Sequence, residues 1–384
     1  VAAPWMAKAY HMPIVPSAVR VFALRLPISA YQSIQTAYIS RRMDFKRFFF
    51  STIIGTLVSA VVGIAMALQG YGVWALIAQY LTNTIIDTLF LAVTVRWHPR
   101  LMFSWKAAKP MIRYGGKVMM TDLLGTVCNN LGDFIIGAKY TSADLAYYTK
   151  GKQLPTLIKS NIYTSLISVL FPGMSKINDE GEKVKALSRK SIRVLTYIIY
   201  PLMTGLLVVA EPLTIFLYTE KWIAMVPFVW VVCIEAIFSV PGTITLQSVK
   251  AMGYSDKMLK AEIFKKPILI LSIIIAMQYG VMAIALTLPL NTLLEFVING
   301  VMAHKTVDYS IREQLWDCLP ATIMSVLMGA GVLLVAHLPL GLGTIALLFV
   351  EILVGIVIYV LLSVKSLNEE FMALASMAKQ YLKR

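Results

Sequence analysis

The stretch GKVMMTDLLGTVCNNLGDFIIGAKY, residues 116–140, is long and apolar enough to cross a lipid bilayer. A membrane-spanning helix needs about 20 mostly apolar residues. This stretch nevertheless carries polar and charged side chains, and such groups cost several kcal/mol each in hydrocarbon unless a partner or water satisfies them. We therefore predict that its polar residues line an interior: Lys117, Asp122, Asn129, Asn130 and Asp133.

The composition of the whole chain indicates a polytopic membrane protein. Of the 384 residues, 58% are hydrophobic and only 14% are charged, and the mean hydropathy is +0.73. A net charge of +15 could indicate nucleic-acid binding. The basic residues, however, form short clusters between apolar runs, as cytoplasmic loops do, so no nucleic-acid partner is expected. The three cysteines lie inside apolar runs without metal-ligand spacing and are predicted to be packing residues.

Scanning for apolar runs of spanning length predicts an all-α fold with eleven transmembrane helices. The predicted spans are 16–39, 48–69, 72–95, 111–137, 154–174, 192–218, 224–249, 264–278, 281–303, 317–337 and 341–364.

The connections between these spans alternate in charge. Basic clusters such as Arg41 to Arg47 and Lys250 to Lys266 occupy every second connection, whereas the intervening ones are nearly free of Lys and Arg. Because cytoplasmic loops are enriched in Lys and Arg, we predict a cytoplasmic C-terminus. An odd number of spans then places Val1 outside, so an odd number of preceding spans is expected; a true external N-terminus is the alternative.

Polar residues form stripes at helical spacing in three of the spans. Positions i, i+4, i+7 and i+11 share one face of a helix, and such a face must contact protein or a hydrated cavity. A hydrated cavity is the preferred interpretation, and pairing between helices is the alternative. The stripes are Arg25, Ser29, Gln32 and Thr36; Gln79, Asn83 and Asp87; and Asp122, Thr126, Asn129 and Asp133.

Further charges occur singly in apolar runs. Arg20 is five residues from Arg25 and so points to a different face, where a structural role is expected. Lys159 is grouped with Lys139, Lys150 and Lys152 around an outer opening. Glu235 and Glu295 are isolated charges on apolar segments, and Glu351 in the last span is expected to pair locally.

The chain offers no site for catalysis. The predicted extramembrane loops are short, and the sequence contains no phosphate-binding Gly-Lys-Ser/Thr loop, metal-ligand cluster or nucleophile elbow. We therefore predict a protein that is not an enzyme and that holds no cofactor.

Six runs, in order along the chain, resemble the bacterial polysaccharide flippases of the multidrug/oligosaccharidyl-lipid/polysaccharide exporter superfamily. They are RRMDFKRFFF, GYGVWALIAQYL, RWHPRLMFSWKAAKPMIRYG, NNLGDFIIGAKYTSADLAYYTKGKQLP, VLFPGMSKINDE and YPLMTGLLVVAEPLTIFLYTEKW. Ala146 stands where the family commonly has Gly, and YTEKW replaces a form of that turn that usually contains Gly.

The resemblance implies two six-helix lobes and two additional helices, with both termini cytoplasmic. The eleven predicted spans would then be a fourteen-span plan without its first three. On this plan residues 1–95 are the remnant of the N-terminal lobe and 96–109 the cytoplasmic linker. Residues 110–304 form the C-terminal lobe, 314–364 the additional pair and 365–384 a cytoplasmic tail.

The resemblance also implies a function, translocation of an undecaprenyl-diphosphate-linked oligosaccharide repeat for lipopolysaccharide, capsule or exopolysaccharide biosynthesis by alternating access. A proton or sodium gradient would drive it, and membrane lipid, a polysaccharide polymerase and a chain-length regulator are expected partners. An ion-coupled drug or small-solute exporter is the first alternative, and a membrane glycan polymerase or ligase is the second. Arg25 and Arg20 are expected to bind the diphosphate, and the expected sugar or ion contacts are Gln32, Asn83, Asp87, Asp122, Asn129 and Asp133.

The charge alternation makes a direct prediction about topology. In a cysteine-free background, a cysteine introduced at Lys183 should be shielded from an impermeant thiol reagent in intact cells, whereas one at Thr141 should react. Labelling of position 183 from outside would contradict the predicted orientation of the spans.

Overall fold

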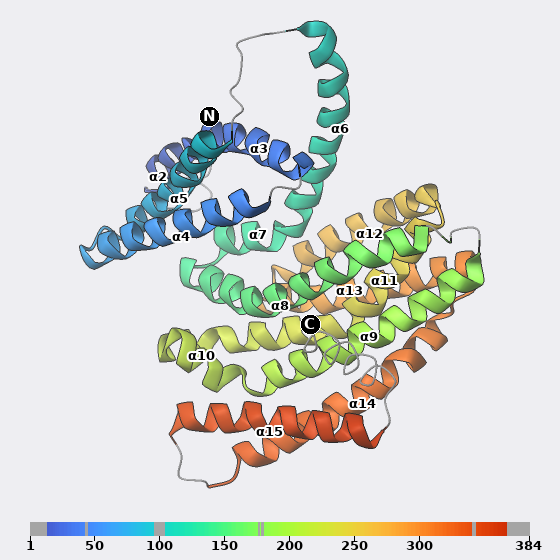
Figure 1. Ribbon diagram of the computed structural model, residues 1–384. Coiled ribbons are helices and arrows are strands. Elements are labelled where there is room, and N and C mark those ends of the chain that lie inside the picture. Colours follow the sequence, from blue (N-terminus) through green and yellow to red (C-terminus); the bar gives the residue numbers. More distant parts are fainter. Residues whose placement is uncertain are drawn as a thin grey trace. The chain divides into compact units, whose positions relative to one another are not determined.

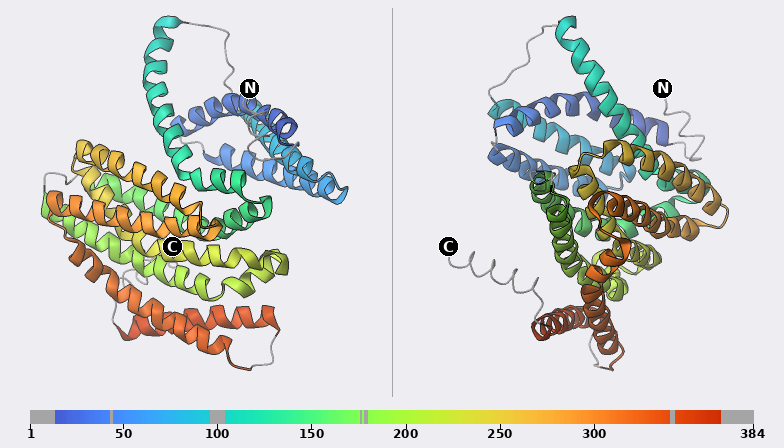
Figure 2. Two further views of the ribbon diagram at one scale, coloured as in Figure 1. Left: turned by 180° about the vertical axis from the view of Figure 1, so that it is seen from behind. Right: turned by 90° about the vertical axis from the view of Figure 1, so that its right-hand side faces the viewer.

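The computed structural model describes residues 14–42, 45–95, 104–175, 177, 180–339 and 343–366, and helices are the regular structure throughout these ranges (Figure 1). The chain divides into two compact units, residues 1–123 and 124–384, which we describe separately. In Figure 2 the first unit runs from blue to teal and the second from teal to red. The first unit contains α2 (Val15–Ala23), α3 (Arg25–Arg42), α4 (Phe45–Leu68), α5 (Val73–Thr94) and most of α6 (Trp105–Asn129).

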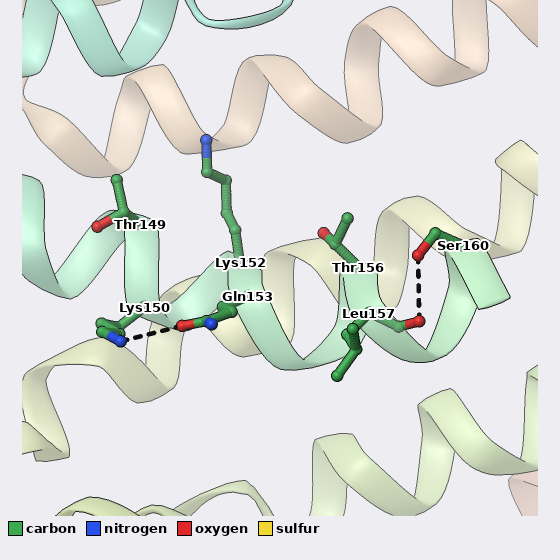
Figure 3. Close-up of a pocket in the computed structure, with 7 residues that line it drawn as sticks. All are labelled: Thr149, Lys150, Lys152, Gln153, Thr156, Leu157 and Ser160. Atoms are coloured by element: carbon green, nitrogen blue, oxygen red, sulfur yellow. Dashed lines mark hydrogen bonds between the residues drawn. The ribbon is translucent and has the colours of Figure 1, made fainter. Parts of the chain in front are cut away.

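The second unit contains the remaining helices. These are α7 (Leu131–Lys139), α8 (Ser142–Ser175; Figure 3), α9 (Gly181–Val208), α10 (Ala210–Tyr218), the 3₁₀ helix η1 (Glu220–Met225), α11 (Val226–Ala251), α12 (Ser255–Ala276), α13 (Val281–Val307), α14 (Ile311–Ala336) and α15 (Thr344–Lys365). The predicted linker 96–109 and tail 365–384 lie largely outside the described residues.

Each predicted span falls on helical residues, which confirms the all-helical prediction. The predicted count of eleven is not confirmed, because seven of the described helices are long and apolar enough to cross a membrane. These are α4, α5, α9, α11 with η1, α13, α14 and α15. The other predicted spans lie on α2–α3, α6–α7, α8 and α12.

Three spans predicted as continuous are interrupted. Two of the breaks have the same cause, because a proline has no N–H to donate to the carbonyl four residues earlier. The break before Pro27 follows the end of α2 at Ala23, and the break before Pro212 follows the end of α9 at Val208. The third break is at Asn130, whose side chain donates to the Thr126 carbonyl at 2.8 Å, a local bond that competes with the helix.

In the first unit, α4 presents a row of small residues to α5. Ser51, Gly55 and Ser59 recur every four residues, the spacing that lets two membrane helices approach closely. A Cβ atom at Gly55 would lie 2.0 Å from Asp87 Oδ1. The polar stripe of α5 therefore lies against α4 at this point.

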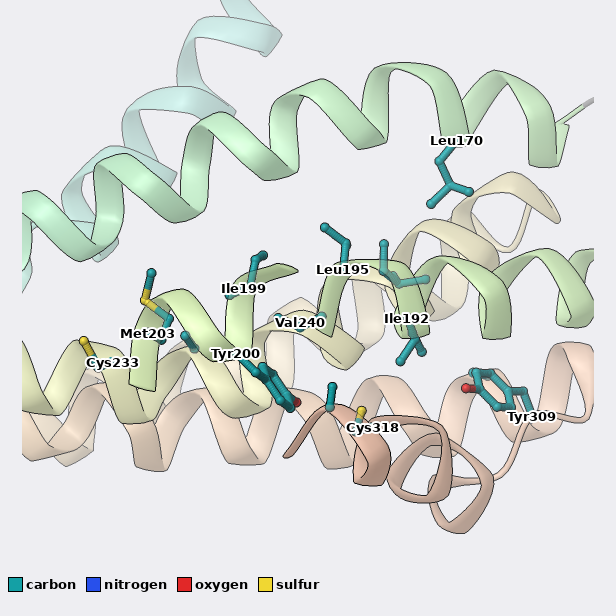
Figure 4. Packing of buried hydrophobic residues seen from close by; sticks show 14 of the residues in the cluster. Leu170, Ile192, Leu195, Ile199, Tyr200, Met203, Cys233, Val240, Tyr309 and Cys318 are labelled. Carbon is teal, nitrogen blue, oxygen red and sulfur yellow. The ribbon is translucent and has the colours of Figure 1, made fainter. Parts of the chain in front are cut away.

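The core of the second unit is built around α11, which packs between α8, α9 and α13. Figure 4 shows this core, with Leu170 of α8, Ile192 and Leu195 of α9 and Val240 of α11 among its residues. Gly151 permits the close contact of α8 with α11, since a Cβ atom there would lie 2.6 Å from Phe228 Cβ.

A buried carboxylate ties α14 to α9. Asp317 accepts from Arg189 Nε at 2.8 Å and Nη2 at 3.0 Å, from Arg193 Nε at 2.9 Å and from the Tyr309 hydroxyl at 2.9 Å. Burial, and then the Asp317 charge, raise the pKa of Tyr309 above its ordinary value, so its hydroxyl remains a donor. On α15, Tyr359 donates to the Tyr197 carbonyl of α9 at 2.7 Å. These bonds hold the last two helices against the rest of the unit.

Candidate functional site

One face of α8 forms an open groove of about 550 Å³. Its described lining residues recur at helical spacing along α8. Figure 3 shows Lys150 and Gln153 bonded on one side of the helix, at 3.1 Å, while Lys152 extends to the other side. The groove is lined by Thr149, Lys150, Lys152, Gln153, Thr156, Leu157 and Ser160.

The Lys152 ammonium is neutralised by a carboxylate of the preceding helix. Its Nζ lies 2.6 Å from Asp133 Oδ1 and 4.0 Å from the centre of the Tyr148 ring. Asp133 stands in the first turn of α7, where unpaired backbone N–H groups favour a negative charge. Both members of the pair are only about a quarter exposed or less.

Two turns further along, a second buried pair links α8 to α11. The Lys159 ammonium bonds Glu235 Oε2, and the other carboxylate oxygen accepts from Thr292 Oγ1 of α13 at 3.1 Å. The side chains of Lys159 and Glu235 are 15% and 12% exposed. Both Glu235 oxygens are therefore occupied, and three helices meet at this carboxylate.

In the first unit, Arg25 sits at the start of α3 with part of its guanidinium unused. Its Nε donates to Thr84 Oγ1 of α5 at 2.8 Å. The guanidinium carbon lies 5.8 Å from the centre of the Phe22 ring and 5.7 Å from that of Tyr80, a cation–π arrangement. Its two terminal nitrogens have no hydrogen-bond acceptor among the residues that the structure describes.

The first unit also brings Gln32 of α3 to Asp87 of α5. The Asp87 side chain is 8% exposed and interacts with the side chains of Gln32 and Ser51. Asn83, one turn earlier on α5, lies beside Gly55, with its Nδ2 3.3 Å from where a Cβ atom would be. Asn83 and Asp87 of the predicted stripe therefore contact neighbouring helices of the first unit.

The structure shows fewer contacts for the remaining predicted site residues. Arg20 and Asn129 are exposed, and the side chain of Asp122 lies outside what the structure describes. The sequence allowed Asp133 to neutralise Arg25, but Lys152 is the cation that pairs with Asp133. The roles predicted for Arg25, Arg20, Gln32, Asn83, Asp87, Asp122, Asn129 and Asp133 stay predictions.

Sequence analysis did not identify the polar face of α8 as a site. It grouped Lys152 and Lys159 at an outer opening and treated Glu235 as isolated, whereas the structure pairs both lysines with carboxylates. The signal was available in the spacing of Lys152, Thr156, Lys159 and Tyr163, which lie 4, 3 and 4 residues apart and so share one helical face.

Comparison with known proteins identifies the family. Residues 1–227 match the family described as polysaccharide biosynthesis protein. The chain belongs to this family. It is 21% identical over 234 residues to the succinoglycan biosynthesis transport protein ExoT of Rhizobium meliloti (strain 1021), a match that covers 61% of this chain and 47% of that protein.

The lipopolysaccharide biosynthesis protein WzxC of Escherichia coli (strain K12) is 25% identical over 230 residues, covering 59% of this chain and 46% of WzxC. The chain thus spans about half the length of the curated relatives it matches. These names confirm the predicted resemblance to polysaccharide flippases. They also confirm that the family is one of transporters.

The fold is that of a solved membrane flippase. The chain superimposes on a structure titled lipid II flippase MurJ, inward closed conformation, with a TM-score of 0.72 over 91% of this chain and 74% of that one, at 15% identity. With its seven apolar helices, this member of the polysaccharide biosynthesis protein family is a multi-pass membrane protein.

The Lys159–Glu235 pair generates a stability prediction. Lys159→Met leaves a buried carboxylate without its cation, which costs about 3–5 kcal/mol. We therefore expect a clearly lower thermal unfolding midpoint in detergent, and recovery when Glu235→Leu removes the second charge as well. Lys150→Met is the matched control, because Lys150 of the same helix makes an exposed hydrogen bond to the neutral Gln153 and pairs with no carboxylate among the described residues. Equal midpoints for the two single variants would contradict the structural role of the pair.

Proposed function

We propose that the protein translocates an undecaprenyl-diphosphate-linked oligosaccharide across the bacterial inner membrane by alternating access, for lipopolysaccharide, capsule or exopolysaccharide biosynthesis. The observation that carries this proposal is membership of the polysaccharide biosynthesis protein family, with relatives named as a succinoglycan transport protein and a lipopolysaccharide biosynthesis protein. The fold shared with a protein named as a lipid II flippase agrees with it.

The groove on α8 suits the sugar part of such a substrate. Carbohydrates offer many hydroxyl groups and few charges, and the groove supplies neutral donors and acceptors from Thr149, Gln153, Thr156 and Ser160. Lys152 is paired with Asp133, whereas Lys150 is bonded to the neutral amide of Gln153 and keeps its positive charge at this surface. The groove would bind sugars through hydrogen bonds that are easily exchanged with water.

Arg25 suits the diphosphate. A guanidinium binds phosphate oxygens through paired N–H groups, and the two terminal nitrogens of Arg25 have no acceptor among the described residues. The Phe22 and Tyr80 rings and the Thr84 hydroxyl group hold the Arg25 guanidinium in place before a ligand binds. Gln32, Asn83 and Asp87 on the same unit, with Asp122, Asn129 and Asp133, are the further proposed sugar or ion contacts.

The orientation and energy source belong to the same proposal. The C-terminus is cytoplasmic, as the positive-inside distribution of Lys and Arg supports, and a proton or sodium gradient drives transport. A polysaccharide polymerase and a chain-length regulator are proposed partners, since the exported repeat must be polymerised after it crosses the membrane.

The role of Arg25 can be tested in cells that lack their own flippase. Arg25→Ala should abolish export of the glycan at an unchanged protein level, and Arg25→Lys should recover only part of it, because an ammonium replaces the paired N–H groups poorly. Export is measured as cell-surface polysaccharide, together with accumulation of the lipid-linked precursor.

The control is Arg20→Ala, since Arg20 is an exposed arginine of the preceding helix. We expect a smaller loss than for Arg25→Ala. If Arg25→Ala together with Asp122→Asn restores export, then Arg25 neutralises a carboxylate and does not bind the diphosphate. Full export by Arg25→Ala alone would remove Arg25 from the site.

A further inference from the structure

A polar cavity of about 200 Å³ lies inside the second unit, between α8, α11 and α13. It is separate from the open groove on α8, although Lys159 follows that groove along the same helix. Water occupies about 30 Å³ per molecule in the liquid, so the cavity can hold several waters. Its lining is unusually polar for a helix bundle in a membrane: Lys159, Tyr163, Glu235, Ser239, Thr243, Thr292, Glu295 and Asn299, with Phe238, Gly242, Leu246 and Phe296.

One buried acceptor in this lining has no partner. The Asn299 side chain is 3% exposed and its Nδ2 donates to the Gly242 carbonyl of α11 at 3.1 Å. Its Oδ1 accepts no hydrogen bond from any described residue. A buried acceptor left unsatisfied costs about 1–3 kcal/mol. Water in the cavity, or a protonated carboxyl group beside it, can supply the donor that the described residues do not.

The carboxyl group that can supply this donor is Glu295, one helical turn before Asn299 on α13. Glu235 cannot act in this way, because Lys159 and Thr292 already occupy both of its oxygens. Glu295 makes no hydrogen bond or ion pair with any described residue. As an ionised carboxylate it only accepts, whereas in the protonated form it gains an O–H donor.

Glu295 also reaches towards a charged cluster on α12. It lines a second, smaller pocket with Lys265, Lys266 and Asn291. The charged groups that face it are Lys265, Lys266 and Glu262 of α12 and Glu235 of α11, and Lys159 of α8 lies across the cavity. Lys265 is paired with Glu262 at 2.6 Å, and Lys159 is paired with Glu235. Glu295 is the carboxylate between these two pairs that has no cation of its own.

We propose that Glu295 is a proton-binding site, which takes up a proton from water in this cavity and releases it towards the Lys265–Glu262 pair. Carboxylates in membrane interiors commonly serve as proton relays. Protonation neutralises the second carboxylate beside Glu235 and provides the donor that Asn299 Oδ1 lacks. This proposal rests on the proposed function. It places the coupling of proton movement to transport in the interior of the second unit, and not at Asp122 and Asp133 of the predicted stripe.

The test uses the purified protein in proteoliposomes containing undecaprenyl-diphosphate-linked oligosaccharide. An imposed pH gradient should accelerate translocation by the wild type, and Glu295→Gln should lose this stimulation while the rate without a gradient is kept. Glu351→Gln is the matched control, because Glu351 is also a buried carboxyl of this unit but lies on α15, away from the cavity. This control should respond to the gradient as the wild type does.

A second measurement does not depend on transport. Infrared difference spectra on acidification should show a protonated-carboxyl band in the wild type that Glu295→Gln lacks and Glu351→Gln keeps. Retained pH stimulation in Glu295→Gln, or stimulation by a sodium gradient at constant pH in place of a proton gradient, would overturn the proposal. If the wild type moves no lipid-linked oligosaccharide, the proposed function fails, and the infrared band alone decides whether Glu295 binds a proton.

Discussion

The ion pair between Lys159 and Glu235 is the contact on which the second unit depends. An unpaired charge in a membrane interior is too costly to keep, so the ammonium of α8 and the carboxylate of α11 must remain together. Thr292 brings α13 to the same carboxylate. The pair therefore fixes three helices in register. Both members of the pair also line the polar cavity between α8, α11 and α13.

The first unit accommodates a buried charge in a different way. There the buried carboxylate of Asp87 is accommodated by small residues of α4 and by polar side chains, Ser51 and Gln32, rather than by a cation. Asp87 contributes to packing between helices, which is the alternative interpretation of its polar stripe. Arg25 donates through Nε to Thr84, and its two terminal nitrogens have no acceptor among the described residues.

The helices could be predicted from the sequence because hydrophobic length is a local property. The breaks at Pro27 and Pro212 follow a local rule as well, because a proline lacks the N–H that continues the helix. The partners of the buried charges could not be predicted. Lys159 and Glu235 are 76 residues apart, and nothing in either segment specifies which other helix lies opposite. Asn299 was missed for the same reason, since an unsatisfied acceptor is defined only by its surroundings.

The central claim is that this chain moves a lipid-linked oligosaccharide between leaflets, and it is tested most directly with purified protein. Proteoliposomes are prepared with fluorescent undecaprenyl-diphosphate-linked oligosaccharide in both leaflets, and the sugar exposed outside is removed with an impermeant glycosidase. We predict that vesicles with the protein allow digestion of the inner-leaflet lipid as well, whereas protein-free vesicles protect it. Equal protection in both kinds of vesicle, with the protein folded and inserted, would contradict the account.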